Sequence, residues 1–323
     1  MTERALPERA LPGRAVTVRA VARETSACCT AAMRIASLHR YPVKSMQGEQ
    51  LEVAQVGDRG LAGDRAYALV DAEDGSVASA KHPRKWGSLL GFSARFTDEP
   101  ALDGPPPPVL VRFPDGAERR SGEAGTDAAL SAVLGRRVRL TCEVPAGARF
   151  EEQWPAIDGL APQAFIDRTT SSHEGPEPVS ALDLGVLAPP GTFFDLAVLH
   201  LLTDATLRHL AGLEPGPVFD VRRYRPNLVV GGAPDGFAED AWVGQELRAG
   251  GLRAQVSMLA MRCVMTTLAQ PGLEQDRDSL RAIARHHRAD IPGMGTWACA
   301  GVYGGVSGAG AVRVGDEVGI GST

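Results

Sequence analysis

Short runs of β-forming residues, each ended by a turn signal within about ten residues, limit the folds open to this chain. In the first third, RIASLHRYPV (34–43) and AYALVDA (66–72) are two such runs, with Gly-Asp and Asp-Gly pairs nearby. In the last third, WACAGVYGGV (297–306) and AVRVGDEVGI (311–320) repeat the pattern. Many strands with few helices predict a β-rich α+β fold that contains a barrel or sandwich rather than a doubly wound sheet.

Three segments carry helical signals. DAALSAVLG (127–135) stops at a glycine, and DRDSLRAIARHHRA (276–289) repeats its apolar residues with a helical period. Within 196–213, Thr203 or Asp204 is placed to cap a third helix. The β-branched residues of MRCVMTTLA instead predict a strand.

The chain of 323 residues has about twice the length of a typical domain. Residues 1–32 are rich in Arg, Pro and Ala without an apolar period, so we expect a disordered extension or a misassigned start, with Met33 as a plausible true start. The β-rich unit of 33–145 precedes a Pro-, Gly- and Ser-rich stretch at 146–190, which we expect to be a surface connection. A second domain is predicted over 191–320.

Charge and cysteine content exclude several classes of protein. The net charge of -5 gives no global reason to expect binding to nucleic acid or to an anionic membrane. Five scattered cysteines fit neither a disulfide framework nor a paired zinc site. Without a spanning apolar stretch of roughly 18 residues or a signal-peptide core, the chain is expected to be soluble and cytoplasmic.

Lysine is scarce in this chain. Of 34 basic residues, only Lys44, Lys81 and Lys85 are lysines, and all three lie in the first third. With so strong an arginine bias, a position that remains lysine is a candidate for a specific task. Chance survival of three lysines would give the same pattern.

Five motifs occur in an order that resembles the order of motifs in MOSC-domain proteins. They are YPVKSMQG (41–48), GLAGDRAYALVD (60–71), RYRPNLVV (223–230), RCVMTTLAQPG (262–272), and GVYGGV followed by RVGDEV (301–318). The resemblance extends from about 33 to 320. It is closest to the branch with an N-terminal MOSC β-domain, which includes the mitochondrial amidoxime-reducing component and bacterial hydroxylaminopurine-resistance proteins. It implies this β-domain over 33–145 and a MOSC β-barrel-like domain with a few helices over 191–320.

The resemblance implies that Cys263 is the protein ligand to molybdenum and therefore also a catalytic residue. A thiolate is the soft ligand expected for such a metal, although an isolated cysteine is also a common packing residue. Cys299 is expected to be structural.

The resemblance also implies a molybdenum–pterin cofactor, the molybdenum cofactor (Mo-molybdopterin), whose phosphate and long polar pterin require cations and planar donors. Each matching residue has an ordinary alternative as a surface charge, a turn residue or strand packing. One segment departs from the family, because Asp195-Leu196-Ala197-Val198 stands where relatives often carry Asp-x-Ser-Pro or Asp-x-Ala-Pro; we predict no site residue there. The predicted cofactor-binding residues are Lys44, Ser45, Arg65, Arg225, Asn227, Arg262 and Tyr303.

The activity implied by the resemblance is reduction of small N-hydroxylated compounds by a molybdenum-dependent oxidoreductase. Two alternatives remain open: a sulfur carrier with a Cys263 persulfide, and a cofactor-binding module without turnover. Pyridoxal phosphate, mentioned for the family, is disfavoured because its Schiff base would have only Lys85 available. The chain lacks iron–sulfur, haem and dinucleotide motifs and ends at Thr323 directly after the last predicted strand, so we expect a separate redox protein to donate electrons.

Overall fold

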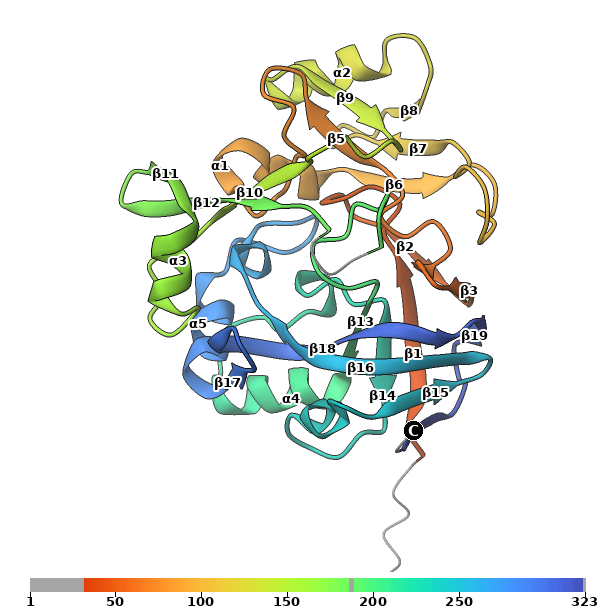
Figure 1. The fold of residues 1–323 in the computed structure, drawn as a ribbon, viewed down its shortest axis with the longest axis vertical. Helices are drawn as coiled ribbons and strands as arrows, with labels where there is room; N and C mark the ends of the chain where they lie inside the picture. Colours follow the sequence, from red (N-terminus) through yellow and green to blue (C-terminus); the bar gives the residue numbers. More distant parts are fainter. Residues whose placement is uncertain (1–31, 186–188, 322–323) are drawn as a thin grey trace, which may run out of the picture. The chain divides into compact units, whose positions relative to one another are not determined.

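A nine-stranded sheet is the largest element of the computed structural model, which describes residues 32–185 and 189–321 (Figure 1). Its neighbouring strands are antiparallel except for β13 and β14, which run parallel. In spatial order the strands are β2 (Glu49–Leu51), β1 (Arg34–Arg40), β14 (Leu228–Gly231), β13 (Leu199–Thr203), β18 (Gly295–Gly308), β16 (Leu252–Met261), β15 (Glu246–Ala249) and β20 (Val318–Gly321), with β17 (Arg288–Ile291) also on β18. The predicted N-terminal extension lies outside the described residues.

Four smaller sheets complete the strand-rich α+β fold, which confirms the predicted fold class. Two of them, with β5, β9 and β6 to β8, share a core of Trp86, Leu89 and Phe92. The four sheets are β5 (Ala68–Asp71) with β9 (Val138–Thr141); β6 (Ser93–Phe96), β7 (Val109–Arg112) and β8 (Glu118–Arg120); β19 (Gly310–Arg313), β3 (Val53–Gly57) and β4 (Gly60–Leu61); and β10 (Arg149–Gln153), β12 (Glu177–Asp183) and β11 (Thr170–Glu174).

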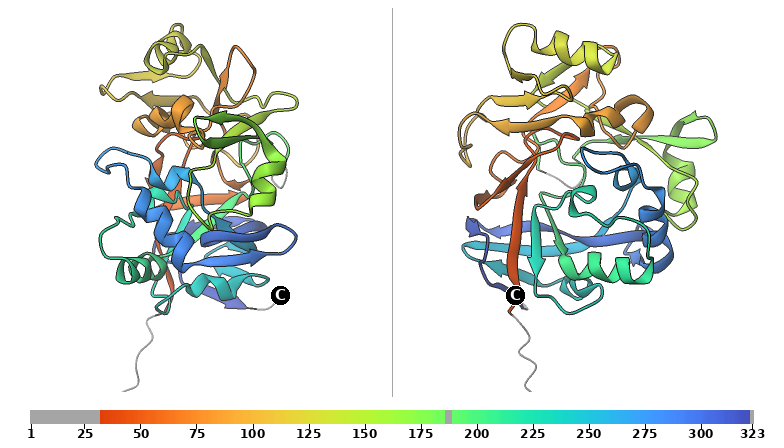
Figure 2. Two further views of the ribbon diagram at one scale, coloured as in Figure 1. Left: turned by 90° about the vertical axis from the view of Figure 1, so that its left-hand side faces the viewer. Right: turned by 180° about the vertical axis from the view of Figure 1, so that it is seen from behind.

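The three predicted helices form where their caps indicate. Gly135, at a φ of 64°, ends α2 (Thr126–Leu134). Thr203 begins α4 (Asp204–Leu213), because its hydroxyl accepts the Thr206 N–H, and Asp276 caps α5 (Arg277–His286) in the same way. The helices α4 and α5 pack against each other and against β13, β14 and β18 (Figure 2).

Two further helices and four 3-10 turns complete the described elements. They are α1 (Pro83–Trp86) and α3 (Gln163–Thr169), with the turns η1 (Gly87–Gly91), η2 (Val221–Arg223), η3 (Ala238–Trp242) and η4 (Val264–Thr267). None of the helices in the described part of the chain combines the length and apolarity needed to cross a membrane.

Two predictions of secondary structure are wrong. Residues 146–190 were expected to be a surface connection, but 149–183 form β10, α3, β11 and β12. Their strands were missed because RFEEQ is mostly polar and β12 contains a proline, both weak strand signals. MRCVMTTLA was expected to be a strand, but β16 ends at Met261 and a 3-10 turn follows.

Candidate functional site

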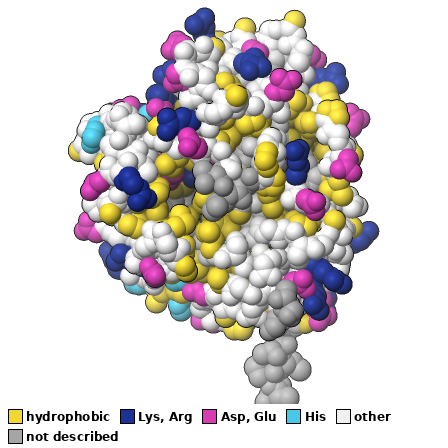
Figure 3. Space-filling model, in the orientation of Figure 1, with side chains coloured by type: hydrophobic (Ala, Val, Ile, Leu, Met, Phe, Trp, Pro, Cys, Tyr) yellow, Lys and Arg dark blue, Asp and Glu magenta, His cyan; other side chains and the backbone are white. Residues whose placement is uncertain are grey.

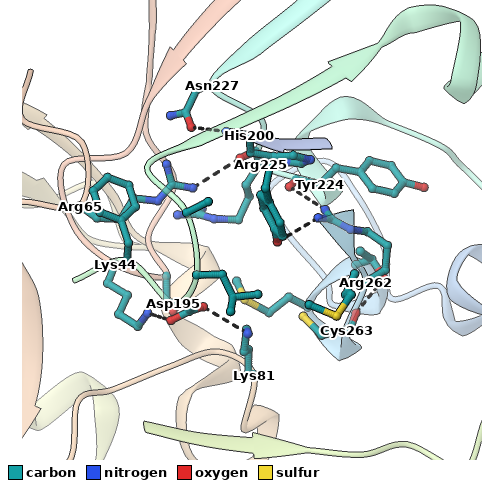
Figure 4. Close-up of a pocket in the computed structure, with 18 of the residues that line it drawn as sticks. Lys44, Arg65, Lys81, Asp195, His200, Tyr224, Arg225, Asn227, Arg262 and Cys263 are labelled. Atoms are coloured by element: carbon teal, nitrogen blue, oxygen red, sulfur yellow. Dashed lines mark hydrogen bonds and ion pairs between the residues drawn. The ribbon is translucent and has the colours of Figure 1, made fainter. Parts of the chain in front are cut away.

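The structure brings all eight predicted site residues into one pocket, which we call the cationic pocket (Figure 4). The N-terminal segments, the loop after η2, β18 and the turn after β16 all contribute to it. The residues that line it are Lys44, Ser45, Arg65, Lys81, Phe193, Phe194, Asp195, Leu196, Ala197, His200, Arg223, Tyr224, Arg225, Asn227, Met261, Arg262, Cys263, Met265, Thr266 and Tyr303.

Three of these residues have a left-handed backbone. Ser45, Arg65 and Arg225 have φ values of 66°, 48° and 55°, and no other non-glycine residue in the described ranges has a positive φ. This conformation costs a non-glycine residue about 1 kcal/mol or more and occurs preferentially at functional sites. The local sequence contributes, because Pro226 disfavours a right-handed helical backbone at Arg225. The strain therefore coincides with the cationic pocket.

Arg65 and Arg225 lie close to each other in spite of their like charges. Their guanidinium carbons lie 4.6 and 4.1 Å from the centre of the Tyr41 ring. Arg225 donates to the Met46 carbonyl at 2.6 Å and has no ion-pair partner among the described residues. Burial, reinforced by the charge of Arg65, lowers the pKa of Arg225 to about 10. This arrangement favours an anion between the two arginines.

Asn227 serves mainly to hold the walls of the pocket together. Its side-chain oxygen accepts the backbone N–H of His200 at 3.1 Å, and its amide donates to Asp64 at 2.8 Å and to a strand β1 carbonyl at 3.3 Å. Asp64 also accepts the Tyr41 N–H at 2.7 Å and pairs with Arg65. Asn227 thus connects β13 to the turn that carries Arg65.

A chain of alternating charges begins in the pocket with Lys44, Asp195 and Lys81 (Figure 4) and ends at Glu152 outside it. Asp195 pairs with Lys44 and lies 3.2 Å from Lys81, which in turn lies 3.1 Å from Glu152. Burial opposes the charge on Lys81, yet the charges of Asp195 and Glu152 raise its pKa well above the ordinary value. The lysine scarcity had already marked Lys81, but Lys81 lies outside the family motifs and Asp195 lies in the segment that departs from them.

Cys263 follows the end of β16 and is only partly buried. The next turn curls back on it, because the hydroxyls of Thr266 and Thr267 donate to the carbonyls of Cys263 and Val264 at 3.0 and 2.8 Å. Arg223 holds the same turn by donating to three of the carbonyls that follow. Burial raises the pKa of the Cys263 thiol, and the nearby charge of Lys81 acts in the opposite direction.

Arg262, Tyr303 and His200 line the pocket together with Cys263. His200 was not among the predicted site residues. Arg262 donates to two carbonyls and, at 3.1 Å, to the Tyr303 hydroxyl. The His200 ring lies 5.4 Å from the Tyr303 ring, and its Nε2 is buried without a hydrogen-bond partner among the described residues. Burial and the charge of Arg262 lower the pKa of His200 well below the ordinary value. A neutral imidazole with one free nitrogen therefore lines the pocket.

Cys263 also lines a second cavity, which we call the aromatic cavity. Its volume is about 460 Å³, and its wall is formed largely by β10, α3 and β12. Seven residues line both cavities: Lys81, Asp195, Leu196, Met261, Arg262, Cys263 and Tyr303. The other residues of the aromatic cavity are Phe150, Glu152, Trp154, Phe165, Thr169, Ala181, Leu182, Asp183, Met294 and Trp297.

Comparison with known proteins identifies the family. Residues 32–85 match the MOSC N-terminal beta barrel domain, and residues 191–319 match the MOSC domain. The chain belongs to the MOSC-domain family. The MOSC domain is associated with proteins of the molybdenum-cofactor sulfurase type, so this MOSC-domain chain has a general role related to that cofactor. Neither match includes residues 86–190.

Solved structures resemble the MOSC-domain chain more distantly. The YUAD protein from Bacillus subtilis is 12% identical, with a TM-score of 0.42, over 91% of this chain and 97% of that one. YiiM from Geobacillus stearothermophilus is 14% identical, with a TM-score of 0.30, over 53% of this chain and 75% of that one. No curated protein matches the sequence.

The donors of the cationic pocket fit a molybdenum–pterin cofactor. Lys44, Arg65 and Arg225 line this pocket alone and offer positive charge to a phosphate, and no carboxylate lines it alone. The free nitrogen of His200 is available to a polar ring. No group of three or more His, Cys, Asp or Glu residues converges as a metal site in the described ranges.

Proposed function

We propose that this chain binds a molybdenum–pterin cofactor in the cationic pocket, with Cys263 as the protein ligand to the metal, and reduces N-hydroxylated compounds. The observation that supports this most strongly is the strained pair of Arg225, which is buried, and Arg65, which is partly buried, in the same pocket as a partly buried thiol. Asp64 pairs with Arg65, but no described carboxylate pairs with Arg225, so the two like charges favour an anion between them. A thiol beside an anion site matches a cofactor that carries both a phosphate and a soft metal.

Each side chain then has a task. Lys44, Arg65 and Arg225 would hold the phosphate and the polar parts of the cofactor by charge-assisted hydrogen bonds. When bound, the cofactor supplies the two-electron chemistry by which an N–OH group becomes N–H, with two protons taken up and water released. Lys81 lines both cavities and keeps its proton, so it would present a positive charge beside Cys263.

A separate redox protein would deliver the electrons, because the chain carries no motif for an electron-transfer cofactor. On the face shown in Figure 3, charged side chains of both signs are scattered around a more hydrophobic middle. A surface with charges of both signs suits the brief contacts of electron-transfer partners.

Metal analysis followed by a reduction assay tests the proposal. The purified full chain should contain molybdenum and pterin in about equal amounts, and should reduce 6-hydroxylaminopurine under anaerobic conditions with a chemical reductant but not with NADH or NADPH alone. Labile sulfur without molybdenum would favour the sulfur carrier. Full molybdenum loading without reduction by any donor would favour a binding module, and rapid turnover with NADH would contradict the need for a partner.

A further inference from the structure

The cofactor proposed for the cationic pocket gives no role to the residues that line the aromatic cavity alone. We propose that this cavity binds the flat aromatic part of the substrate, and that it selects cationic or uncharged rings over anionic ones. The inference rests on the proposed function only in taking the bound molecule to be the substrate, because it is the walls of the cavity that determine which molecules fit.

Three aromatic rings form the apolar wall. The ring centres of Trp154 and Phe165 are 5.8 Å apart, those of Phe165 and Trp297 are 5.1 Å apart, and those of the two tryptophans are 6.0 Å apart. Both indole N–H groups donate within the protein, to Ser180 at 2.8 Å and to the Met294 carbonyl at 2.9 Å. The tryptophans therefore offer a ligand carbon surface, and this surface favours a flat ring.

The volume is suitable for such a ligand. About 460 Å³ lies within the range of roughly 300 to 1,000 Å³ that is typical of small-molecule sites. The cationic pocket encloses about 120 Å³ and joins this cavity at Cys263, so a molecule in the aromatic cavity lies beside the thiol.

The charges of the aromatic cavity oppose those of the cationic pocket. Glu152 and Asp183 line the aromatic cavity alone, and no lysine or arginine does. Glu152 is 5% exposed, and its partner Lys81 is shared with Asp195. Glu152 therefore has only part of the charge of one lysine, whereas Asp195 also pairs with Lys44. The incompletely matched charge of Glu152 disfavours an anionic ligand and favours a cationic one.

The wall is built from a part of the chain that is separate from the matched domains. Phe150, Trp154 and Phe165 lie in 86–190, between the two matched segments, whereas Trp297 lies within the second. This segment can therefore help to determine which molecule reaches Cys263.

Calorimetric titration of the purified full chain with three small molecules tests the inference. Benzamidine is flat and cationic, benzoate has the same ring with a negative charge, and acetamidine has the positive charge without a ring. We expect benzamidine to bind about tenfold more tightly than either of the others, because benzoate carries the opposite charge and acetamidine lacks the ring contact.

Variants assign the binding to the cavity. Phe165→Ala should weaken benzamidine binding about two- to tenfold, and Phe165→Leu, which keeps most of the packing, should weaken it in the same direction. Glu152→Gln should weaken benzamidine binding and narrow its advantage over benzoate. Phe237→Ala is the matched control, because Phe237 is also half-buried but lines neither cavity; its affinity should equal that of the wild type.

The outcomes separate this inference from the proposed function. Equal affinity for the three molecules, or wild-type affinity in both Phe165 variants, would overturn the inference. Loss of molybdenum and pterin from these variants with unchanged benzamidine binding would also overturn it, because the cavity would then belong to the cofactor. If the expected binding pattern holds in a protein without molybdenum or reductase activity, the cavity stands and the proposed function fails.

Discussion

The cationic pocket and the aromatic cavity meet at Cys263, but the side chains that line only one of them carry opposite charges. Apart from shared residues, the first has four cations and no carboxylate, whereas the second has two carboxylates and no cation. The first contains all three left-handed non-glycine residues of the described ranges. The second has none of these and is lined by aromatic rings that pack against one another.

The difference shows how each cavity affects the protein when it is empty. The like charges of Arg65 and Arg225 and the strained backbone oppose folding, so binding of an anion should stabilise the cationic pocket. The rings of the aromatic cavity stabilise the fold whether or not a ligand is present. Substitutions in the two cavities should therefore have different effects on stability, and the following predictions use that difference.

The largest effect is expected at the residue that both cavities share. Cys263→Ser should lower reductase activity by more than about a hundredfold, because a hydroxyl is a harder and poorer ligand than a thiolate. The thermal midpoint should change little, since the side chain is only partly buried. Cys142→Ser, at a partly buried cysteine outside both cavities, is the control. Full activity of Cys263→Ser in a reductant-driven assay would refute the ligand assignment.

The next effect compares two neighbouring arginines. Arg225→Met should lower the affinity for the cofactor about tenfold or more through the loss of charge-assisted contacts. It should also leave the cofactor-free protein at least as stable as the wild type, because repulsion from Arg65 disappears. Metal content and urea unfolding of the cofactor-free protein measure the two quantities.

Arg223→Met should have the opposite effect on the stability of the cofactor-free protein. The Arg223 guanidinium donates to four carbonyls, so its loss should destabilise the protein by more than about 2 kcal/mol. If Arg225→Met destabilises the cofactor-free protein as much as Arg223→Met does, the argument from like charges is wrong.

The smallest effect concerns the outer side of the aromatic wall. Glu151 on β10 lies 2.8 Å from His82 and 2.6 Å from Lys85, and the hydrogen bonds from these residues lower its pKa from 4.5 to about 2. A lowered folded-state pKa stabilises the protein above pH 4.5, and this stability is lost as the pH falls toward 2. Glu151→Gln should therefore cost about 1 to 2 kcal/mol at neutral pH, and the difference should shrink in acid. Urea unfolding from pH 7 to 3 measures it, and a constant difference would contradict the assignment.

The sequence predicted the cationic pocket better than the aromatic cavity for a physical reason. Turns such as VKS, GDR and RPN place charged residues at fixed positions in short motifs, and these can be recognised without the fold. Arg65 and Arg225 could therefore be proposed for one site although 160 positions separate them.

The aromatic cavity depends on tertiary contacts that no local pattern reveals. Trp154, Phe165 and Trp297 come from a strand end, a short helix and a distant strand, and each alone is an ordinary core residue. The predicted surface connection hid the first two, because polar strands carry little hydrophobic periodicity. Asp195 was missed because its partners Lys44 and Lys81 approach it only in the folded chain.

X-ray absorption at the molybdenum edge tests the central claim most directly, because it counts the sulfur atoms bound to the metal. The account predicts that Cys263→Ser has about one sulfur neighbour fewer than the wild type, or loses the metal altogether. Cys142→Ser should be identical to the wild type. The same number of sulfur neighbours in all three proteins, or a wild type purified without molybdenum, would contradict the assignment of Cys263 as the ligand.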